Sequence, residues 1–425
     1  MGKYLDDLFL YPKSWIDDDA REFAAAARSW AEKEILADRL KYLQNYERLF
    51  VEKRGTLVRD IGFERLVLPG EHGGYDWNKP SSAPGILTVF TEIGRADEAI
   101  SFIAALKYAL FAVISMEPNT DKSLLDELAP LYLADGIKNV ALVLPGPGTC
   151  GEVTALFAGR SVPVDIKAGR NGCTITGKRL RPLGPGLDAD LFGVVCMDKS
   201  SHPCVAFVPA DAKGVRKHDP IKTTGLNACR NADVTFDKVV VPKTHLIMRE
   251  GAVQELYAWL NLLLGGTSIG GALNFFEILV NWAENRTIKG TDIMKENPLC
   301  ASVLATVAEE VAGARLMAYS LAHLMAQPED WGGVGGAGVF TFAQMLGGRI
   351  QQGCLNAINR GMELMGSAGY AREWHVEKHW RDVKTIQSWL CGVGSDVPVK
   401  MDVARYFYDC KEVSYEAFRR VLASA

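Results

Sequence analysis

The feature that most constrains this fold is a block of short apolar segments lying between two stretches of helical sequence. In the first stretch, apolar side chains recur at helical spacing. A run of acidic residues, Asp17-Asp18-Asp19, precedes the first helical segment and suits a helix start. We therefore predict an N-terminal helical domain over residues 1–138, with helices over Ala20–Ile35, Tyr46–Ile61, Ile86–Ile114 and Asp121–Asp135.

The middle of the chain has a different pattern. Between residues 139 and 243, apolar or alternating runs are short and are separated by Gly, Pro and Asp turns, which is typical of antiparallel strands. The length of this segment suits a small barrel or sandwich. We predict a central β domain with strands over Val140–Leu144, Cys173–Gly177, Leu191–Cys196, Cys204–Val208 and Val234–Phe236.

The last part, residues 244–425, is helical again. Long segments rich in Ala and Leu with short connections favour an antiparallel bundle. They cover Glu250–Arg286, Cys300–Ala326, Phe340–Met365 and Val397–Leu422. The chain is therefore predicted to be an α+β protein with an N-terminal helical domain, a central antiparallel β barrel or sandwich, and a C-terminal four-helix bundle.

Composition excludes several classes of function. The net charge of −4 and the interleaving of acidic and basic residues argue against a nucleic-acid partner. No window holds 18 uninterrupted apolar residues, so we expect no transmembrane helix and no membrane partner. Nine scattered cysteines without a signal peptide indicate reduced thiols and a cytoplasmic protein.

Two motifs have ordinary explanations. Of the two Gly-x-Gly-x-x-Gly matches, Gly146–Gly151 is followed by further strand sequence, and Gly333–Gly338 lies between two helices as a flexible linker. Neither has the strand–turn–helix context of a dinucleotide site. His375 and His379 are four residues apart and could reach one metal, but a surface or interface helix is the better interpretation because the metalloprotease pattern is broken at Val376. No metal site is predicted.

The order of segments, together with several motifs, resembles the acyl-CoA dehydrogenase superfamily over essentially the whole chain. The matching stretches are Leu68–Gly74, Val239–Pro242, Trp282–Gly290 and, most specifically, Gly366–Lys384, which is similar to the family's Gly-Gly-x-Gly-Tyr … Val-Glu-Lys … Arg-Asp-x-Lys signature. The resemblance implies FAD-dependent α,β-dehydrogenation of an acyl-CoA thioester. It also implies electron transfer to an electron-transferring flavoprotein and assembly as dimers or tetramers.

Carried over residue by residue, the resemblance assigns cofactor-binding roles. Arg286 matches the arginine that binds the FAD pyrophosphate across a subunit interface, and a guanidinium fork suits a diphosphate. Gly366 and Gly369 match the turn that lets the backbone approach the cofactor. Glu363 stands where the family has a Gln facing the pyrophosphate, and a carboxylate there is repulsive unless it is neutralised.

The family's catalytic base is missing at both of its usual positions. The position three residues after Gln387 is Leu390, and its neighbour is Cys391, which could act as a base only with a lowered pKa. The alternative position falls near Leu260, and Glu255 lies more than a helical turn away. The catalytic residue is therefore unknown.

The flavin-ring contacts also depart from the family pattern. Arg181 and Leu183 replace the aromatic and hydroxyl residues of the family's Trp-x-Thr strand, and Pro182 between them has no backbone donor. Lys107 and Tyr108 interrupt an apolar helix where the family lines its acyl pocket, and they either set substrate polarity or lie on an exposed helical face.

Three functions are consistent with these departures. The first is one subunit of a heteromeric acyl-CoA dehydrogenase whose paralogous partner supplies the base. The second is a repurposed flavin monooxygenase or another acyl-CoA-acting flavoprotein on the same fold. The third is a scaffold subunit without catalysis. Because fold alone does not assign chemistry, the sequence leaves all three open.

Overall fold

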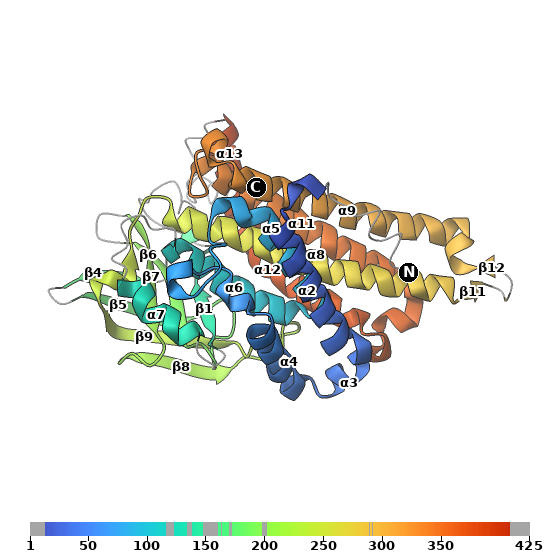
Figure 1. Cartoon of the computed structure of the whole chain (residues 1–425), viewed down its shortest axis with the longest axis horizontal. Coiled ribbons are helices and arrows are strands. Elements are labelled where there is room, and N and C mark those ends of the chain that lie inside the picture. The colour runs from blue at the N-terminus through green and yellow to red at the C-terminus, as the bar shows by residue number, and fades with distance from the viewer. Residues whose placement is uncertain are drawn as a thin grey trace, which may run out of the picture.

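The computed structural model describes residues 13–115, 123–133, 138–147, 160–162, 164–169, 172–197, 202–288, 290 and 292–408. Helices form one elongated body, and a curled sheet lies at one end of it (Figure 1). Residues 148–151 of the first Gly-x-Gly-x-x-Gly match, and the part of the last predicted helix beyond residue 408, lie outside the described residues.

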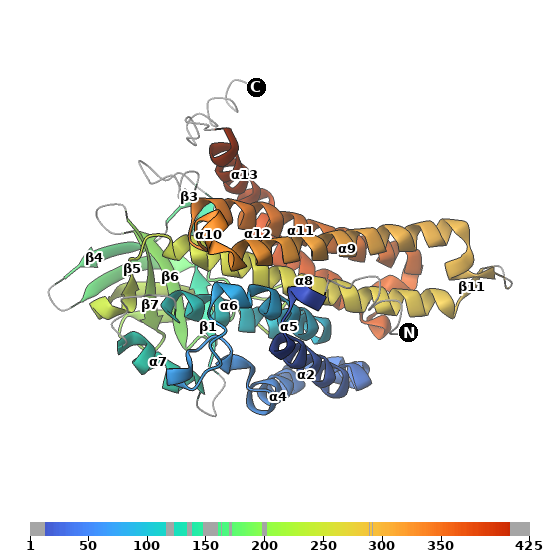
Figure 2. The ribbon, with the colours of Figure 1, turned by 45° about the horizontal axis from the view of Figure 1, so that its top comes forward.

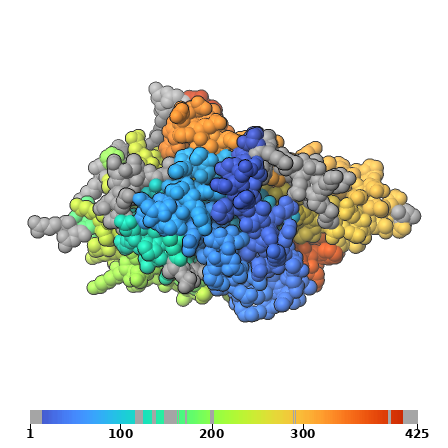
Figure 3. All heavy atoms as spheres, viewed as in Figure 1, coloured from blue at the N-terminus to red at the C-terminus, as the bar shows by residue number. Residues whose placement is uncertain are grey.

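The N-terminal segment is helical, as predicted. Asp17 caps the first long helix, because its side chain accepts a hydrogen bond of 2.7 Å from the backbone N–H of Ala20. These helices cover much of the face seen in Figure 3. They are α2 (Asp18–Glu34), α3 (Arg39–Gln44), α4 (Tyr46–Asp60), α5 (Ala83–Ala96), α6 (Glu98–Ser115) and α7 (Ser123–Leu133). Short 3-10 turns lie before and between them: η1 (Lys13–Trp15), η2 (Leu36–Asp38), η3 (Phe63–Arg65), η4 (Gly70–His72) and η5 (Pro80–Ser82).

The predicted single helix over Ile86–Ile114 is two helices that meet at Asp97. The backbone of Asp97 is extended, which ends α5, and its side chain accepts hydrogen bonds from the N–H groups of Ala99 and Ile100. Asp97 is therefore the cap of α6. The sequence did not predict this break because the apolar pattern continues on both sides of Asp97.

The central segment forms an eight-stranded sheet with the order β10-β7-β6-β4-β5-β9-β8, and β1 pairs with β6 beside this path. Most pairs are antiparallel, as predicted, but β1 and β6 pair in parallel, as do β4 and β6 at Asp165 and Met197. The prediction of antiparallel strands was therefore wrong for β1. A long connection separates β1 from β6 in the chain, which allows the two strands to run in the same direction. The strands are β1 (Val140–Val143), β2 (Gly146–Pro147), β3 (Arg160–Ser161), β4 (Asp165–Ala168), β5 (Cys173–Leu180), β6 (Leu191–Met197), β7 (Pro203–Pro209), β8 (Val215–Pro220), β9 (Ala232–Val241) and β10 (Leu246–Ile247).

The C-terminal helices form the predicted bundle, in which successive long helices reverse direction (Figure 2). Consequently α8 and α11 run in parallel: Asn261 donates to Gln344 over 2.8 Å, and seven residues further on Ser268 donates to Gln351 over 2.7 Å. The helices are α8 (Ala252–Glu284), α9 (Pro298–Ala326), α10 (Pro328–Trp331), α11 (Ala337–Met365), α12 (Val376–Cys391) and α13 (Val393–Tyr408). The shorter elements are η7 (Lys243–His245), β11 (Thr287–Ile288), β12 (Asp292–Ile293), η8 (Met294–Glu296), η9 (Gly366–Tyr370) and η10 (Arg372–Trp374).

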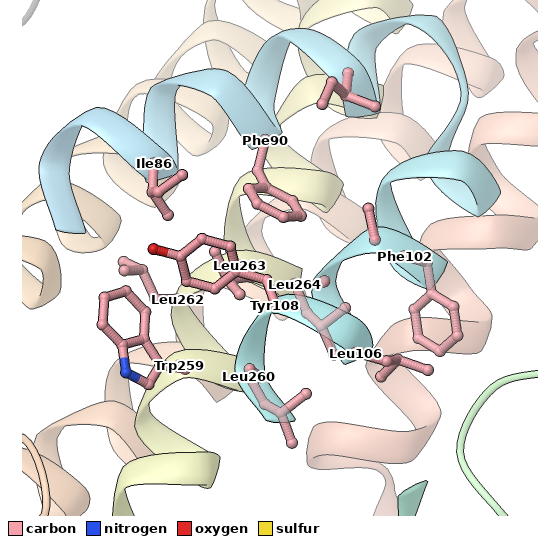
Figure 4. Packing of buried hydrophobic residues seen from close by; sticks show 14 of the residues in the cluster. Ile86, Phe90, Phe102, Leu106, Tyr108, Trp259, Leu260, Leu262, Leu263 and Leu264 are labelled. Carbon is pink, nitrogen blue, oxygen red and sulfur yellow. The ribbon is translucent and has the colours of Figure 1, made fainter. Parts of the chain in front are cut away.

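The largest core joins the N-terminal helices to the bundle. Side chains of α5, α6 and α8 interdigitate there, with Phe90, Phe102 and Trp259 fully buried (Figure 4). Two of these helices, α6 and α8, are long and apolar enough to cross a membrane by length and composition alone, although no run is uninterrupted. Their most apolar windows are 94% and 83% buried inside the protein, which makes them the centre of this core.

Candidate functional site

A cavity of about 360 Å³ lies where the sheet meets the C-terminal helices. On the sheet side, Leu142 and Leu183 form an isolated bridge and exchange two backbone hydrogen bonds of 2.9 and 2.7 Å. On the helix side, α8 contributes Tyr257 and α12 contributes Leu390. Arg181 also lines the cavity, so the structure brings together three of the residues selected from the sequence: Arg181, Leu183 and Leu390. We refer to this cavity as the leucine pocket.

The lining of the leucine pocket is mostly apolar. Among the described residues that line it, none carries a carboxylate. Three of its polar side chains have protein partners: Arg181 donates through Nε to Asp233 over 2.6 Å, Ser388 donates to the backbone oxygen of Thr385, and Gln344 accepts from Asn261. Leu183 uses its backbone N–H on Leu142, and Pro182 has none.

Cys391 is not placed to act as a base in the leucine pocket. Its Sγ atom lies 3.6 Å from the backbone oxygen of Gly348, and the residue does not line the leucine pocket. Burial raises the pKa of the Cys391 thiol to about 11, so the thiol is protonated at neutral pH. A structural role for the Cys391 thiol fits this environment better than an acid–base role.

The other base position is also unsuitable. Leu260 is fully buried in the core between α6 and α8 (Figure 4). Glu255, on the first turn of the same helix, forms an ion pair with Arg249 and does not line the leucine pocket. Neither position supplies a carboxylate to the cavity.

The structure corrects the sequence interpretation of Lys107 and Tyr108. Both side chains are buried, so they lie on no exposed face, and neither lines the leucine pocket. Lys107 forms a buried ion pair with Glu64, and Tyr108 donates a hydrogen bond to the backbone oxygen of Trp77. Burial lowers the pKa of Lys107 to about 8, although Glu64 opposes this shift.

The remaining predicted cofactor residues lie at the other end of the bundle, which we call the distal end. Arg286 follows the end of α8 and is exposed, with its guanidinium 4.5 Å from the ring centre of Trp282. Trp282 in turn packs edge-on against Trp374, at a centroid distance of 4.6 Å. With a rise of 1.5 Å per residue, Arg286 is roughly 40 Å from Tyr257 of the leucine pocket.

Glu363 and the glycine turn belong to this same end, because α11 runs parallel to α8. Arg360 donates to Glu363 over 2.6 Å, which provides the neutralising partner that a carboxylate near a diphosphate requires. Gly366 ends α11 with a φ of +60°, and it is exposed. Gly369 is buried, and a Cβ atom there would lie 2.5 Å from the backbone oxygen of Met362.

A second cavity, of about 410 Å³, lies beside the glycine turn. Residues of α11, of the turn and of α12 line it: Asn359, Met362, Tyr370, Arg372, Glu377, Trp380 and Arg381. Two of them are arginines and two are aromatic. This lining is far more polar than that of the leucine pocket, and it is suited to an anionic group attached to a ring.

A buried network of charges, which the sequence did not reveal, joins the N-terminal helices to α12. Lys378 lies 2.6 Å from Asp382, 3.1 Å from Asp97 and 3.5 Å from a carboxylate oxygen of Glu98. His379 is completely buried and contacts Glu98 and Asn274. The prediction of an interface helix is confirmed for His379. His375 precedes α12 in a left-handed conformation and is not part of this network.

Comparison with known proteins identifies the class of this fold. The family model described as acyl-CoA dehydrogenase, C-terminal domain, matches residues 252–393. A 3-(aryl)acrylate reductase of Clostridium sporogenes is 22% identical over 85% of this chain and 91% of its own length. A probable acyl-CoA dehydrogenase, fadE25 of Mycobacterium leprae, is 23% identical over 91% and 94% of the two chains.

Solved structures agree on the architecture. A glutaryl-CoA dehydrogenase from Mycobacterium smegmatis in complex with FADH2 superimposes with a TM-score of 0.70 at 14% identity, covering 93% of this chain and 96% of that one. The order of helical, β and helical segments is consistent with the architecture of these structural neighbours. The chain belongs to the acyl-CoA dehydrogenase superfamily.

Proposed function

We propose that this chain is a FAD-binding oxidoreductase subunit that takes part in α,β-dehydrogenation of an acyl-CoA thioester, and that a paralogous chain supplies the base. Removal of an α-proton needs a carboxylate held in a dry pocket. The carrying observation is that Leu390 and Leu183 lie together in a pocket where no described lining residue has a carboxylate. Electrons would leave to an electron-transferring flavoprotein, as the family resemblance implies.

The leucine pocket is a poor fit for a flavin ring. The polar edge of such a ring needs hydrogen-bond partners, yet Pro182 has no N–H and the N–H of Leu183 is bonded to Leu142. The described side chains of Arg181, Gln344 and Ser388 bond within the protein. We therefore derive no chemical step in this pocket.

The distal end is a good fit for the diphosphate of FAD. Arg286 presents an exposed guanidinium, and Gly366 leaves an open approach, since no atom lies within 4 Å of a Cβ placed there. Arg360 balances Glu363, so the local charge is not repulsive to phosphate. When bound, FAD supplies the hydride acceptor. Arg286 and the turn would hold its diphosphate.

The distance between the distal end and the leucine pocket supports a cofactor site shared between two chains. The distal end and the leucine pocket of one chain are roughly 40 Å apart along α8, so they cannot hold the same cofactor. A second chain must bring its own pocket to the distal end of this one, which implies a dimer or a tetramer. The paralogue would then provide the ring contacts and the base, while this chain provides Arg286 and the glycine turn.

Visible absorption of the purified chain tests the proposal. We expect little flavin in the chain alone, and flavin absorption together with acyl-CoA dehydrogenase activity after co-purification with a paralogous chain. Stoichiometric FAD and desaturation by the lone chain would contradict the shared site. An oxygenated product formed by a lone flavin-containing chain would favour a monooxygenase, and a complex without flavin would favour a scaffold.

A pair of arginine variants separates the cofactor role from general charge effects. Arg286→Ala should reduce FAD retention by the complex at least tenfold, because a bidentate phosphate contact is lost. The matched control is Arg216→Ala. Arg216 is 66% exposed on β8 and pairs with the surface residue Asp237, so its loss should leave FAD retention unchanged. Equal retention by the two variants would remove Arg286 from the site.

A further inference from the structure

Two cysteines face each other across the hairpin formed by β6 and β7. Cys196 and Cys204 are directly opposed in the antiparallel register. Their Sγ atoms are 3.4 Å apart, and neither residue is in a disulfide. Both side chains are fully buried in the core of the β domain. Their position is independent of the leucine pocket and of the distal end.

The register of this pair is compatible with a disulfide. Directly opposed residues in an antiparallel ladder have Cα atoms about 4.5–5.5 Å apart, inside the range of about 4.4–6.8 Å that disulfides adopt. The two side chains point to the same face of the sheet because they are cross-strand partners. Only small rotations about the Cα–Cβ bonds are needed to bring the sulfurs together.

The place of the pair in the ladder gives an oxidant a route to it. One further rung, Met197 with Pro203, separates Cys196 and Cys204 from the end of the β6–β7 ladder. On the outer side of β7, β10 pairs with Val205 and Ala206 and stops before Cys204. Fraying of the last rungs of a strand pair costs far less than global unfolding, and it would uncover both thiols together.

We propose that Cys196 and Cys204 are a redox-active pair that forms a reversible intramolecular disulfide with a peroxide as oxidant. One thiolate attacks a peroxide oxygen, which breaks the O–O bond, releases water when the oxidant is hydrogen peroxide, and leaves a sulfenic acid. The second thiol attacks that sulfur, forms the S–S bond and releases a second water. Two thiols are oxidised and one peroxide is reduced.

The disulfide would act on the strand that supports the leucine pocket. Gly193 of β6 pairs with Leu142 of β1, and Leu142 lines that pocket. A covalent link three residues further along β6 restricts the opening of this hairpin. Oxidation should therefore raise the thermal midpoint of the full chain, and reduction with dithiothreitol should reverse the shift.

Peptide mapping of the native full chain tests this inference. The reduced protein is treated with hydrogen peroxide, remaining thiols are blocked with N-ethylmaleimide in denaturant, and peptides are identified by mass spectrometry. We expect a Cys196–Cys204 linked peptide in most molecules. Cys354, a buried cysteine of α11, serves as the internal control and should be fully blocked.

Several outcomes would overturn the proposal. If Cys196 and Cys204 are blocked as completely as Cys354, or if the link forms only in urea, the native pair does not react. A link from either residue to Cys173, which belongs to the same core, would also contradict it. Cys204→Ser and the separate Cys196→Ala variant should both lose the oxidation-dependent rise in thermal midpoint, and the wild-type mapping decides the question if either variant fails to fold.

Discussion

The ammonium group of Lys378 lies 2.6 Å from the carboxylate of Asp382, one turn further along α12, and both side chains are buried. Asp382 also accepts a hydrogen bond of 2.6 Å from the backbone N–H of Leu226, at the edge of the β domain. Lys378 reaches Asp97 at the start of α6. One turn of α12 therefore fastens the N-terminal helices, the β domain and the bundle to one another.

Replacing Lys378 should cost much of the protein's stability. Lys378→Met leaves the buried carboxylates of Asp97, Glu98 and Asp382 without their shared cation, and breaking such a buried pair costs about 3–5 kcal/mol. The measurement is the urea midpoint of unfolding. Lys400→Met is the matched control: Lys400 forms an i,i+4 pair with Asp396 but is 69% exposed, and its loss should cost under about 1 kcal/mol. Equal losses would refute a special role for burial.

The contribution of Lys107 to the stability of the folded protein should change with pH in the alkaline range. Its pKa is lowered to about 8 in the folded protein, so between roughly pH 8 and its ordinary value near 10.5 the unfolded chain binds more protons than the native one. Stability then rises with pH in this window. Relative to the Lys107→Met variant, the wild type should gain about 1–3 kcal/mol of unfolding free energy between pH 7.5 and pH 10.5. Urea unfolding of both proteins at the two pH values measures this difference. A difference that stays constant with pH would show that Lys107 titrates normally.

Cys391 should behave as a poor nucleophile. A thiol with a pKa of about 11 is almost entirely protonated at pH 8, and the thiolate is the reactive form. Alkylation of the Cys391 peptide by iodoacetamide should therefore accelerate about tenfold per pH unit from pH 8 to beyond pH 10. A rate that levels off below pH 9 would return Cys391 to the list of candidate bases.

Two glycine substitutions should have opposite effects. Gly366 has a φ of +60° and a ψ of −136°, which L-residues rarely adopt, so Gly366→Ala should cost about 1–3 kcal/mol through backbone strain alone. In contrast, Gly313 lies within α9 and a Cβ there also meets no atom within 4 Å, so Gly313→Ala should stabilise the protein by about 0.5–1 kcal/mol. Thermal unfolding of both variants checks the pair. Stabilisation by Gly366→Ala would mean that the turn relaxes easily.

Periodicity was sufficient to predict most of the fold, and it failed where charged side chains occupy strands or caps. β4 and β8 were missed because Asp165–Ala168 and Val215–Pro220 lie mostly exposed and are rich in charged residues. The break at Asp97 was missed for the opposite reason, since apolar sequence surrounds it. Both cases depend on tertiary context that a window of sequence does not contain.

The candidate site was predictable only where spacing to a motif fixed a position. Counting from Gln387 selected Leu390, and the structure shows that it lines one cavity with Arg181 and Leu183. The burial of Lys107 was not predictable, because its partner Glu64 is distant in sequence and unrelated to any motif. The separation between the leucine pocket and Arg286 also required the structure, since it follows from the length and parallel packing of α8 and α11.

The buried contacts of α12 give the stretch most similar to the family signature a structural role. Lys378 and Asp382, which belong to the stretch most similar to the family signature, hold the domains together through interior ion pairs. Leu390, two turns further on, is half-buried and lines the leucine pocket. A change that disturbs Lys378 or Asp382 would therefore loosen the N-terminal helices and the β domain together, because both are bonded to the same turn of α12.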